Sequence, residues 1–196
     1  MLGHDSSSPA GTDSIAKPTV VNPSSHSTSS SSFQYKRIKD IALGTNSTAF
    51  IDSDGYAYVC GYDGSILKEG VGCLGLGPLV SSDDAKGGDK GDLVSTMHHP
   101  TLITSLVEDG CPIQSVSIGT SHMAVLTTEG EILSTGAAAY GRCGNFFEND
   151  AIDRVYLEPV ELLTSNDHVK QVECGDDFTL ALTRLVDEVV FSLLSL

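Results

Sequence analysis

The stretch Ile38-Lys-Asp-Ile-Ala-Leu-Gly44-Thr-Asn-Ser-Thr-Ala-Phe-Ile occurs again 75 residues later as Ile113-Gln-Ser-Val-Ser-Ile-Gly119-Thr-Ser-His-Met-Ala-Val-Leu. A third copy begins 56 residues after the second, as Val169-Lys-Gln-Val-Glu-Cys-Gly-Asp-Asp-Phe-Thr-Leu-Ala-Leu. In each copy an apolar run ends in a glycine, and a second apolar run follows a few residues later. Recurrence of one unit at such spacings predicts a repeat protein, in which each unit folds in the same way.

Each copy has the pattern of antiparallel β-strands. An acidic residue followed by glycine separates the second and third apolar runs, at Asp54-Gly55 and Glu129-Gly130. This pair predicts a hairpin turn, because glycine tolerates positive φ. Helical periodicity is weak throughout, so the expected fold class is all-β. The expected first strands are 38–43, 113–118 and 169–174, the second strands lie around 49–51, 124–126 and 180–182, and the third strands are 56–60 and 131–135.

This succession of glycines resembles the regulator of chromosome condensation repeat, whose members form seven-bladed β-propellers. The second copy matches best, and it has the histidine that follows the first glycine of the repeat, His122. The resemblance covers about residues 38–184, as repeats at about 38–80, 113–145 and 169–184. It implies antiparallel β-blades of a partial, open β-propeller. The structural positions of the repeat are assigned to Gly44, Gly55, Gly61, Gly75, Gly119, His122, Gly130, Gly136, Gly144 and Gly175.

The copies also depart from the family pattern. Ser47 and Phe178 stand where the family has its repeat histidine. In the third copy the acidic-Gly turn would align with Leu185-Val186, which has neither residue type. We interpret the apolar run at 185–196 as the end of a truncated or altered gene product. The alternative is a short helix that packs on the exposed blade.

Composition excludes several classes of function. The chain has 196 residues, which corresponds to about one domain, and its 11 Lys and Arg against 26 Asp and Glu give a net charge of -15. Such an acidic chain is a poor ligand for nucleic acid and for anionic membranes. No apolar stretch has the length of a membrane helix, and no signal-peptide pattern follows Met1. We therefore expect a soluble intracellular protein, cytoplasmic or nuclear.

The N-terminal region differs from the repeats. Residues 1–33 hold eleven serines and few large apolar side chains, which predicts a disordered tail. We interpret it as a linker, with a phosphorylation platform around Ser8-Pro9 as the alternative. The expected organisation is a disordered tail at 1–33, repeats at 34–184 and an atypical apolar C-terminus at 185–196.

Several residues that could carry chemistry have simpler interpretations. The resemblance makes His122 a core histidine of the repeat that hydrogen-bonds locally, and not a catalytic base. The pair His98-His99 is expected in a solvated loop, with a metal site shared with nearby aspartates as the alternative. The insertion at 81–97 lacks the ligand spacing of a calcium loop, and the glycine-dense segment 70–77 lacks the lysine of a phosphate loop, so we expect a flexible loop and turns. The remaining candidates are an acidic rim and five reduced thiols, at Glu148, Asp150, Asp153, Glu158, Glu161, Cys60, Cys73, Cys111, Cys143 and Cys174.

These observations favour a non-catalytic protein-interaction scaffold. No catalytic, cofactor-binding or metal-binding residue is assigned, and no cofactor is expected. The resemblance also allows guanine-nucleotide exchange on a small GTPase such as Ran, and the third alternative is a truncated, inactive gene product. Because two repeats and a fragment cannot close a seven-bladed ring, apolar faces and strand edges stay open. The expected partners are therefore proteins, among them a small GTPase or a second copy of the chain, and neither nucleic acid nor a membrane.

Overall fold

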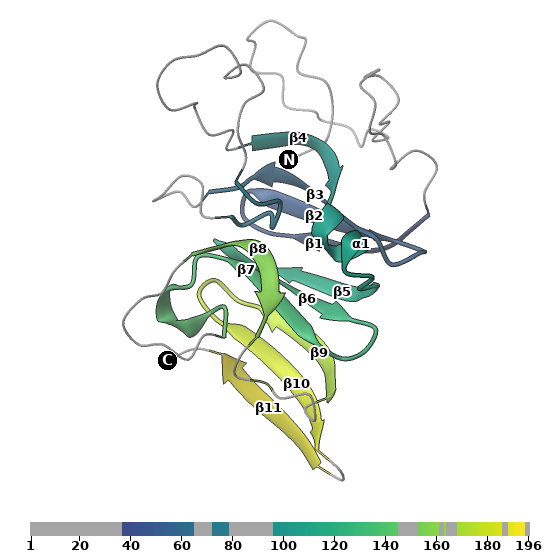
Figure 1. Cartoon of the computed structure of the whole chain (residues 1–196). Helices are drawn as coiled ribbons and strands as arrows, with labels where there is room; N and C mark the ends of the chain where they lie inside the picture. Colours follow the sequence, from purple (N-terminus) through teal and green to yellow (C-terminus); the bar gives the residue numbers. More distant parts are fainter. Residues whose placement is uncertain are drawn as a thin grey trace, which may run out of the picture.

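The computed structural model describes residues 37–64, 72–78, 96–144, 153–160, 163, 168–185 and 188–194. Within them, three antiparallel sheets follow one another along the chain, and Figure 1 shows the sheets stacked side by side. We call them blades 1, 2 and 3. Blade 1 contains β1 (Ile38–Leu43), β2 (Ser47–Asp52), β3 (Ala57–Tyr62) and β4 (Thr96–Leu102). Blade 2 contains β5 (Ile113–Ile118), β6 (His122–Thr127), β7 (Ile132–Gly136) and β8 (Arg154–Pro159). Blade 3 contains β9 (His168–Cys174), β10 (Thr179–Leu185) and β11 (Glu188–Leu194), and the described helices are α1 (Thr104–Glu108) and the 3-10 turn η3 (Ala139–Gly141).

The sequence repeat is reproduced in the pairing of the strands. Ile41 of β1 pairs with Phe50 of β2, and 75 residues later Val116 of β5 pairs with Val125 of β6. The register shifts directly after Ile38 in blade 1 and at the same offset in blade 2. A second shift lies before the closing glycine of β3 and of β7. The expected all-β fold of antiparallel, open blades is therefore confirmed.

Two apolar cores hold the blades together. The larger core lies between blades 1 and 2, and the smaller core lies between blades 2 and 3. The larger core consists of Ala49, Ile51, Ala57, Val59, Leu74, Ile103, Leu106, Ile113, Val116, Ile118, Met123, Val125 and Leu133. The smaller core consists of Ala124, Leu126, Ile132, Val160, Val169, Val172 and Ala181. Because each core takes side chains from two blades, no blade buries its apolar faces alone.

The structure corrects the alternative that was considered for the C-terminal run. Residues 188–194 form strand β11, which pairs with β10 from Thr179 opposite Leu194 to Leu185 opposite Glu188. The alternative of a short helix is therefore wrong. The β-branched and apolar residues of this run continue the sheet although the acidic-Gly turn of the other copies is missing.

Two fourth strands and one short helix were not expected from the sequence. The fourth strand of blade 1, β4, contains Pro100, and that of blade 2, β8, ends at Pro159. Proline is tolerated there because β4 is the last strand in its sheet order. The predicted disorder of residues 1–33 lies outside the described residues, as does most of the insertion at 81–97, of which only Thr96 and Met97 are described, in β4.

Candidate interaction site at the junctions between blades

The junction between blades 2 and 3, here the second junction, is centred on the buried side chain of Arg142. Its Nη1 atom donates hydrogen bonds to Ser121 Oγ and to Asp177 Oδ1, both at 2.7 Å. Its Nε atom donates to the carbonyl oxygen of Ala139, also at 2.7 Å. Arg142 is only 5% exposed, whereas the side chain of Asp177 is 61% exposed. The guanidinium therefore ties the loop after β7 to the loop between β9 and β10, and it leaves the carboxylate accessible.

His122 lies beneath this ion pair and is fully buried. Its Nε2 atom is 2.9 Å from Thr179 Oγ1, and the Thr179 hydroxyl donates to the carbonyl of Arg142 at 2.9 Å. Because the hydroxyl proton is used in that bond, the histidine donates through Nε2–H. Burial, together with the nearby charge of Arg142, lowers the pKa of His122 to about 4. The imidazole is therefore neutral at physiological pH and connects blade 2 to blade 3.

The junction between blades 1 and 2, here the first junction, uses a thiol and a buried carboxylate. Cys73 Sγ donates to the carbonyl of Ser121 at 3.0 Å. The carboxylate of Asp63, 3% exposed, accepts the backbone N–H of Leu74 at 2.8 Å and so holds the turn that carries Cys73. Burial raises the pKa of Asp63, the backbone hydrogen bonds from Leu74 and Gly72 partly oppose this, and the resulting pKa is about 6. Burial, together with the Asp63 charge, raises the pKa of Cys73 to about 12, so the thiol stays protonated.

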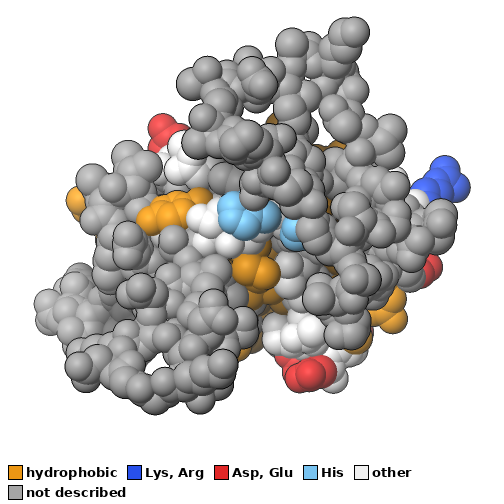
Figure 2. All heavy atoms as spheres, turned by 90° about the horizontal axis from the view of Figure 1, so that it is seen from above, with side chains coloured by type: hydrophobic (Ala, Val, Ile, Leu, Met, Phe, Trp, Pro, Cys, Tyr) orange, Lys and Arg blue, Asp and Glu red, His pale blue; other side chains and the backbone are white. Residues whose placement is uncertain are grey.

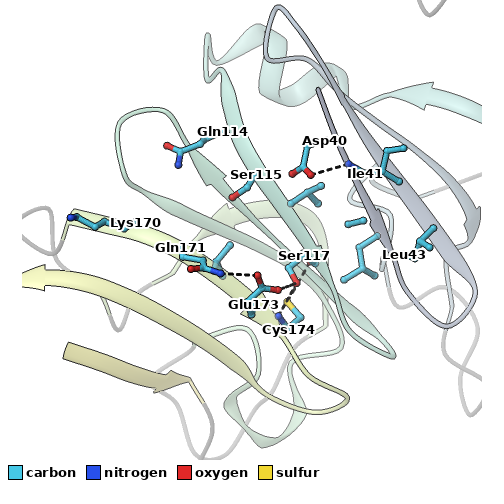
Figure 3. Close-up of a pocket in the computed structure, with 14 residues that line it drawn as sticks. Asp40, Ile41, Leu43, Gln114, Ser115, Ser117, Lys170, Gln171, Glu173 and Cys174 are labelled. Atoms are coloured by element: carbon cyan, nitrogen blue, oxygen red, sulfur yellow. Dashed lines mark hydrogen bonds between the residues drawn. The ribbon is translucent and has the colours of Figure 1, made fainter. Parts of the chain in front are cut away.

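The first strands of the three blades line a concavity of about 580 Å³. Figure 3 shows that its side chains come from β1, β5 and β9. Ser117 Oγ donates to Glu173 Oε2 at 3.2 Å and accepts the backbone N–H of Cys174 at 2.9 Å. Gln171 Nε2 donates to the other Glu173 oxygen at 3.1 Å. The two bonds of Ser117 join β5 to β9 along the wall of the concavity, which is lined by polar and apolar side chains alike.

An exposed corner lies above the second junction. Tyr140 is 68% exposed and has φ 61°, a backbone conformation that is rare for a residue other than glycine. Its ring centroid is 5.4 Å from the guanidinium carbon of Arg142. Asp177 and Phe178, which is 39% exposed, complete the corner on the blade 3 side. We call Tyr140, Asp177 and Phe178 the exposed corner.

The sequence-assigned glycines occupy two kinds of position. Gly136 has φ 104°, and a Cβ there would lie 2.5 Å from the carbonyl oxygen of Ser121. Gly119 has no positive φ, but a Cβ there would collide with the ring of His122 and with the carbonyl of Gly175. Positive φ is found at Gly55, Gly61, Gly75, Gly130, Gly136 and Gly144, and the close-approach positions are Gly44, Gly119 and Gly175.

Some of the other sequence candidates lie in different structures from those expected. His98 and His99 lie in strand β4 and not in a loop, so the expectation of a solvated loop is wrong for this pair. In an extended strand, neighbouring side chains point to opposite faces, which separates the two imidazoles. Figure 2, which looks onto the molecule from above, shows histidine side chains next to hydrophobic side chains on the face in view. Among the described residues, no group of three or more His, Cys, Asp or Glu side chains is placed to hold a metal ion.

The glycine-dense segment and the acidic rim make contacts within the fold. Gly77 donates its N–H to the carbonyl of Val155 at 2.8 Å, and Leu76 forms a bridge with Tyr156, so the end of the segment packs on β8. Arg154 pairs with Glu158 at 3.5 Å. Asp153 accepts the backbone N–H of Ala138 at 3.3 Å. Glu148, Asp150 and Glu161 lie outside the described residues, and the cysteines are free thiols at Cys60, Cys73, Cys111, Cys143 and Cys174.

Sequence reasoning missed the residues that join the blades. Arg142 and Cys73 occupy the same place in the glycine-flanked turns Gly141-Arg-Cys-Gly and Gly72-Cys-Leu-Gly. The alignment of these turns could have marked both as junction residues. Nothing in the sequence pattern marks Thr179, whose role depends on the neighbouring blade.

Comparison with known proteins agrees with this arrangement. The sequence model of the "Regulator of chromosome condensation (RCC1) repeat" matches residues 129–182. The matched segment begins at the turn before β7 and ends in β10, so one sequence repeat takes its strands from two blades. Residues 129–182 therefore form an RCC1 repeat. Arg142, Asp177 and Thr179 of the second junction lie inside the matched segment, whereas Ser121 and His122 precede it.

Relatives and solved structures resemble the chain over the same region. The serine/threonine-protein kinase Nek9 of Mus musculus is 26% identical over 151 residues, which is 77% of this chain and 13% of Nek9. The probable E3 ubiquitin-protein ligase HERC4 of Rattus norvegicus is 36% identical over 85 residues, 43% of this chain and 8% of HERC4. The structure of yeast RCC1 (Prp20) bound to Kap60 has a TM-score of 0.58 at 20% identity, over 79% of this chain and 32% of that chain. Prp20p from Saccharomyces cerevisiae, solved separately and described with its binding properties to Gsp1p and histones, has a TM-score of 0.54 at 20% identity, over 78% and 32% of the two chains.

The chain spans only a small part of each relative, 8 to 13% of the kinase and ligase chains and about a third of the RCC1 structures. Over the region that they have in common, the chain and the solved RCC1 structures share one fold. The described residues contain no helix long and apolar enough to cross a membrane.

Proposed function

We propose that this chain is a non-catalytic protein-interaction scaffold built of RCC1 repeats between residues 34 and 184. The observation that carries the proposal is the exposed corner, which a buried network holds in place. Arg142 fixes Tyr140 and Asp177 from below through a ring contact and an ion pair. Tyrosine and arginine are frequent at the energetic centres of protein interfaces, and loops on a rigid scaffold commonly carry recognition.

A matched pair of tyrosine variants tests this surface. The chain is immobilised, and the proteins that it captures are quantified for the wild type, Tyr140→Ser and Tyr156→Ser. Tyr156 is 48% exposed on β8, away from the second junction, and serves as the control. We expect Tyr140→Ser to lose captured proteins that Tyr156→Ser keeps. With one purified partner, calorimetry should then show at least a tenfold weaker Kd for Tyr140→Ser, and equal affinities for the two variants would disprove the role of the corner.

Guanine-nucleotide exchange on a small GTPase is the second candidate function. The support for it is the similarity of the fold to Prp20p, which is described as binding Gsp1p. Release of a fluorescent guanine nucleotide from a panel of small GTPases separates the two proposals. The scaffold proposal predicts no acceleration by the chain, and a catalytic acceleration would replace it with exchange activity.

A further inference from the structure

The outer side of β1 carries two exposed apolar side chains, Ile41 at 57% and Leu43 at 73%. Side chains alternate along a strand, and the intervening Ala42 packs against the core between blades 1 and 2. Ile41 and Leu43 therefore face away from blade 2, and Figure 3 shows both on the side of β1 opposite to Asp40.

The repeat shows what these two positions normally contact. The counterparts of Ile41 and Leu43 in blade 2 are Val116 and Ile118, each 8% exposed and part of the core shared with blade 1. In blade 3 the counterpart of Ile41 is Val172, which is 3% exposed in the core shared with blade 2. In blades 2 and 3 the side of the first strand that carries these residues thus packs on the preceding blade. In blade 1 the described residues provide no preceding blade.

The opposite end of the array has the complementary face. Leu180 of β10 is 37% exposed, while its neighbour Ala181 is fully buried against blade 2. The counterparts of Leu180 in blades 1 and 2 are Ala49 and Ala124, both 0% exposed and packed in the cores shared with the following blade. Leu180 therefore belongs to a face that packs on a following blade, which the described residues do not provide.

We propose that a second copy of this chain covers these faces, with β1 of one copy packed on β10 of the next. The chain contains the equivalent contact twice, at its first and second junctions, so the backbone arrangement of the repeat already provides for packing of a first strand on a preceding blade. Neither face is its own complement, because one is the preceding and the other the following side of a blade. The association is therefore head-to-tail, and it either closes into a ring or continues as a chain of copies. This inference does not depend on the partner proposed for the exposed corner.

Complementation of two variants tests this arrangement. Leu43→Asp places a charge on the β1 face, and Leu180→Asp places one on the β10 face. We expect the wild type to form dimers or larger species with rising concentration in light scattering after size exclusion, and each variant alone to associate at least tenfold more weakly. A mixture of the two variants retains one intact β1 face and one intact β10 face on different molecules. We therefore expect the mixture to form a one-to-one dimer at concentrations at which neither variant alone associates.

A control variant and a folding measurement complete the test. Val107→Asp changes a side chain that is 37% exposed on α1, the helix between β4 and β5, and is part of neither face, so this variant should associate like the wild type. Melting curves of the dilute variants establish that each remains folded; Leu43 in particular is too exposed for its replacement to disturb a core. A monomeric wild type at all concentrations would overturn the proposal. Loss of association in Leu43→Asp alone, with Leu180→Asp unaffected, would also overturn it, because that result describes a symmetric contact between two β1 faces.

Discussion

The two junctions between blades are built on equivalent backbone positions but with different side chains. Cys73 and Arg142 occupy the same place in the turns that follow the third strands, and both bond to the loop of the next blade. The loop before the second strand then contributes Ser121 at the first junction and Asp177 at the second. A thiol and a backbone carbonyl thus do at one junction what a guanidinium and a carboxylate do at the other.

The two junctions differ in how much of their stability comes from apolar packing and how much from buried polar groups. At the first junction the apolar core is large, with thirteen buried side chains among the described residues, and the thiol bond adds little. At the second junction the core has seven, and the buried network of Arg142, His122 and Thr179 accompanies it. We infer that blade 3 depends on polar groups and on the protonation state of His122, whereas blade 1 depends on apolar packing.

The largest effect on stability is expected for valine at the close-approach glycines, and it should differ between Gly119 and Gly44. In Gly119→Val the new Cβ meets the ring of His122 and the rigid carbonyl of Gly175, so we expect a loss of about 3 kcal/mol or more in the free energy of unfolding. In Gly44→Val the nearest backbone atom, the carbonyl oxygen of Gly119, is 3.1 Å from the new Cβ, against 2.5 Å for the carbonyl of Gly175 in Gly119→Val, so the loss should be smaller. Denaturant melts measure both values.

Gly110 provides the control for these glycine variants. It has φ 65° with nothing within 4 Å of a Cβ, so Gly110→Ala should cost only the backbone strain of about 1 kcal/mol. Equal losses at Gly44 and Gly119 would contradict the argument that the second junction is the less tolerant one.

Smaller losses of stability are expected when the two turn residues, Arg142 and Cys73, are replaced. Arg142→Met removes three hydrogen bonds but leaves Asp177 free to be solvated, so we expect a loss of about 2 kcal/mol. Cys73→Ala removes one weak hydrogen bond and a small volume, and should cost about 1 kcal/mol. Lys170→Met, an exposed cation on β9, is the control and should stay within about 0.5 kcal/mol of the wild type. If Cys73→Ala were the more destabilising variant, the polar network would not support the second junction.

A third comparison concerns the pH dependence of the free energy of unfolding, which has opposite signs at the two junctions. The pKa of His122 is about 4 in the folded chain against 6.5 for a free histidine, so the unfolded chain binds the extra proton between these values. Stability from His122 is complete above pH 6.5 and is lost as the pH falls to about 4, by about 2 to 3 kcal/mol. The advantage of the wild type over His122→Gln, measured by denaturant melts, should shrink by that amount across this range.

Asp63 at the first junction has the reverse dependence. Its pKa is about 6 when folded against 3.8 for a free aspartate, so the folded chain binds the extra proton and gains stability as the pH falls from 6 to 3.8. In Asp63→Asn the free energy of unfolding should therefore fall more steeply with decreasing pH than in the wild type. In His122→Gln it should fall less steeply. Parallel pH profiles for both variants and the wild type would refute the assignment of opposite signs.

Much of the fold followed from the positions of a few glycines. The expected first strands 38–43 and 113–118 coincide with β1 and β5, and the turns at Gly55 and Gly130 join the second and third strands as expected. These features are local, because a strand pattern and a tight turn depend on residues within the same segment. The fourth strands β4 and β8 were not foreseen, since an edge strand that contains or ends in proline lacks a strong strand pattern.

The sequence by itself determined that this chain is a series of β-blades that resemble the RCC1 repeat, because spacing and turn chemistry repeat along it. Only the tertiary structure decided which side chains join the blades. Arg142, Thr179 and Asp63 acquire their roles from partners that are distant in sequence, and no local pattern marks such partners. The same holds for the exposed faces at Leu43 and Leu180, since a position equivalent to buried ones becomes exposed when no described blade lies next to it.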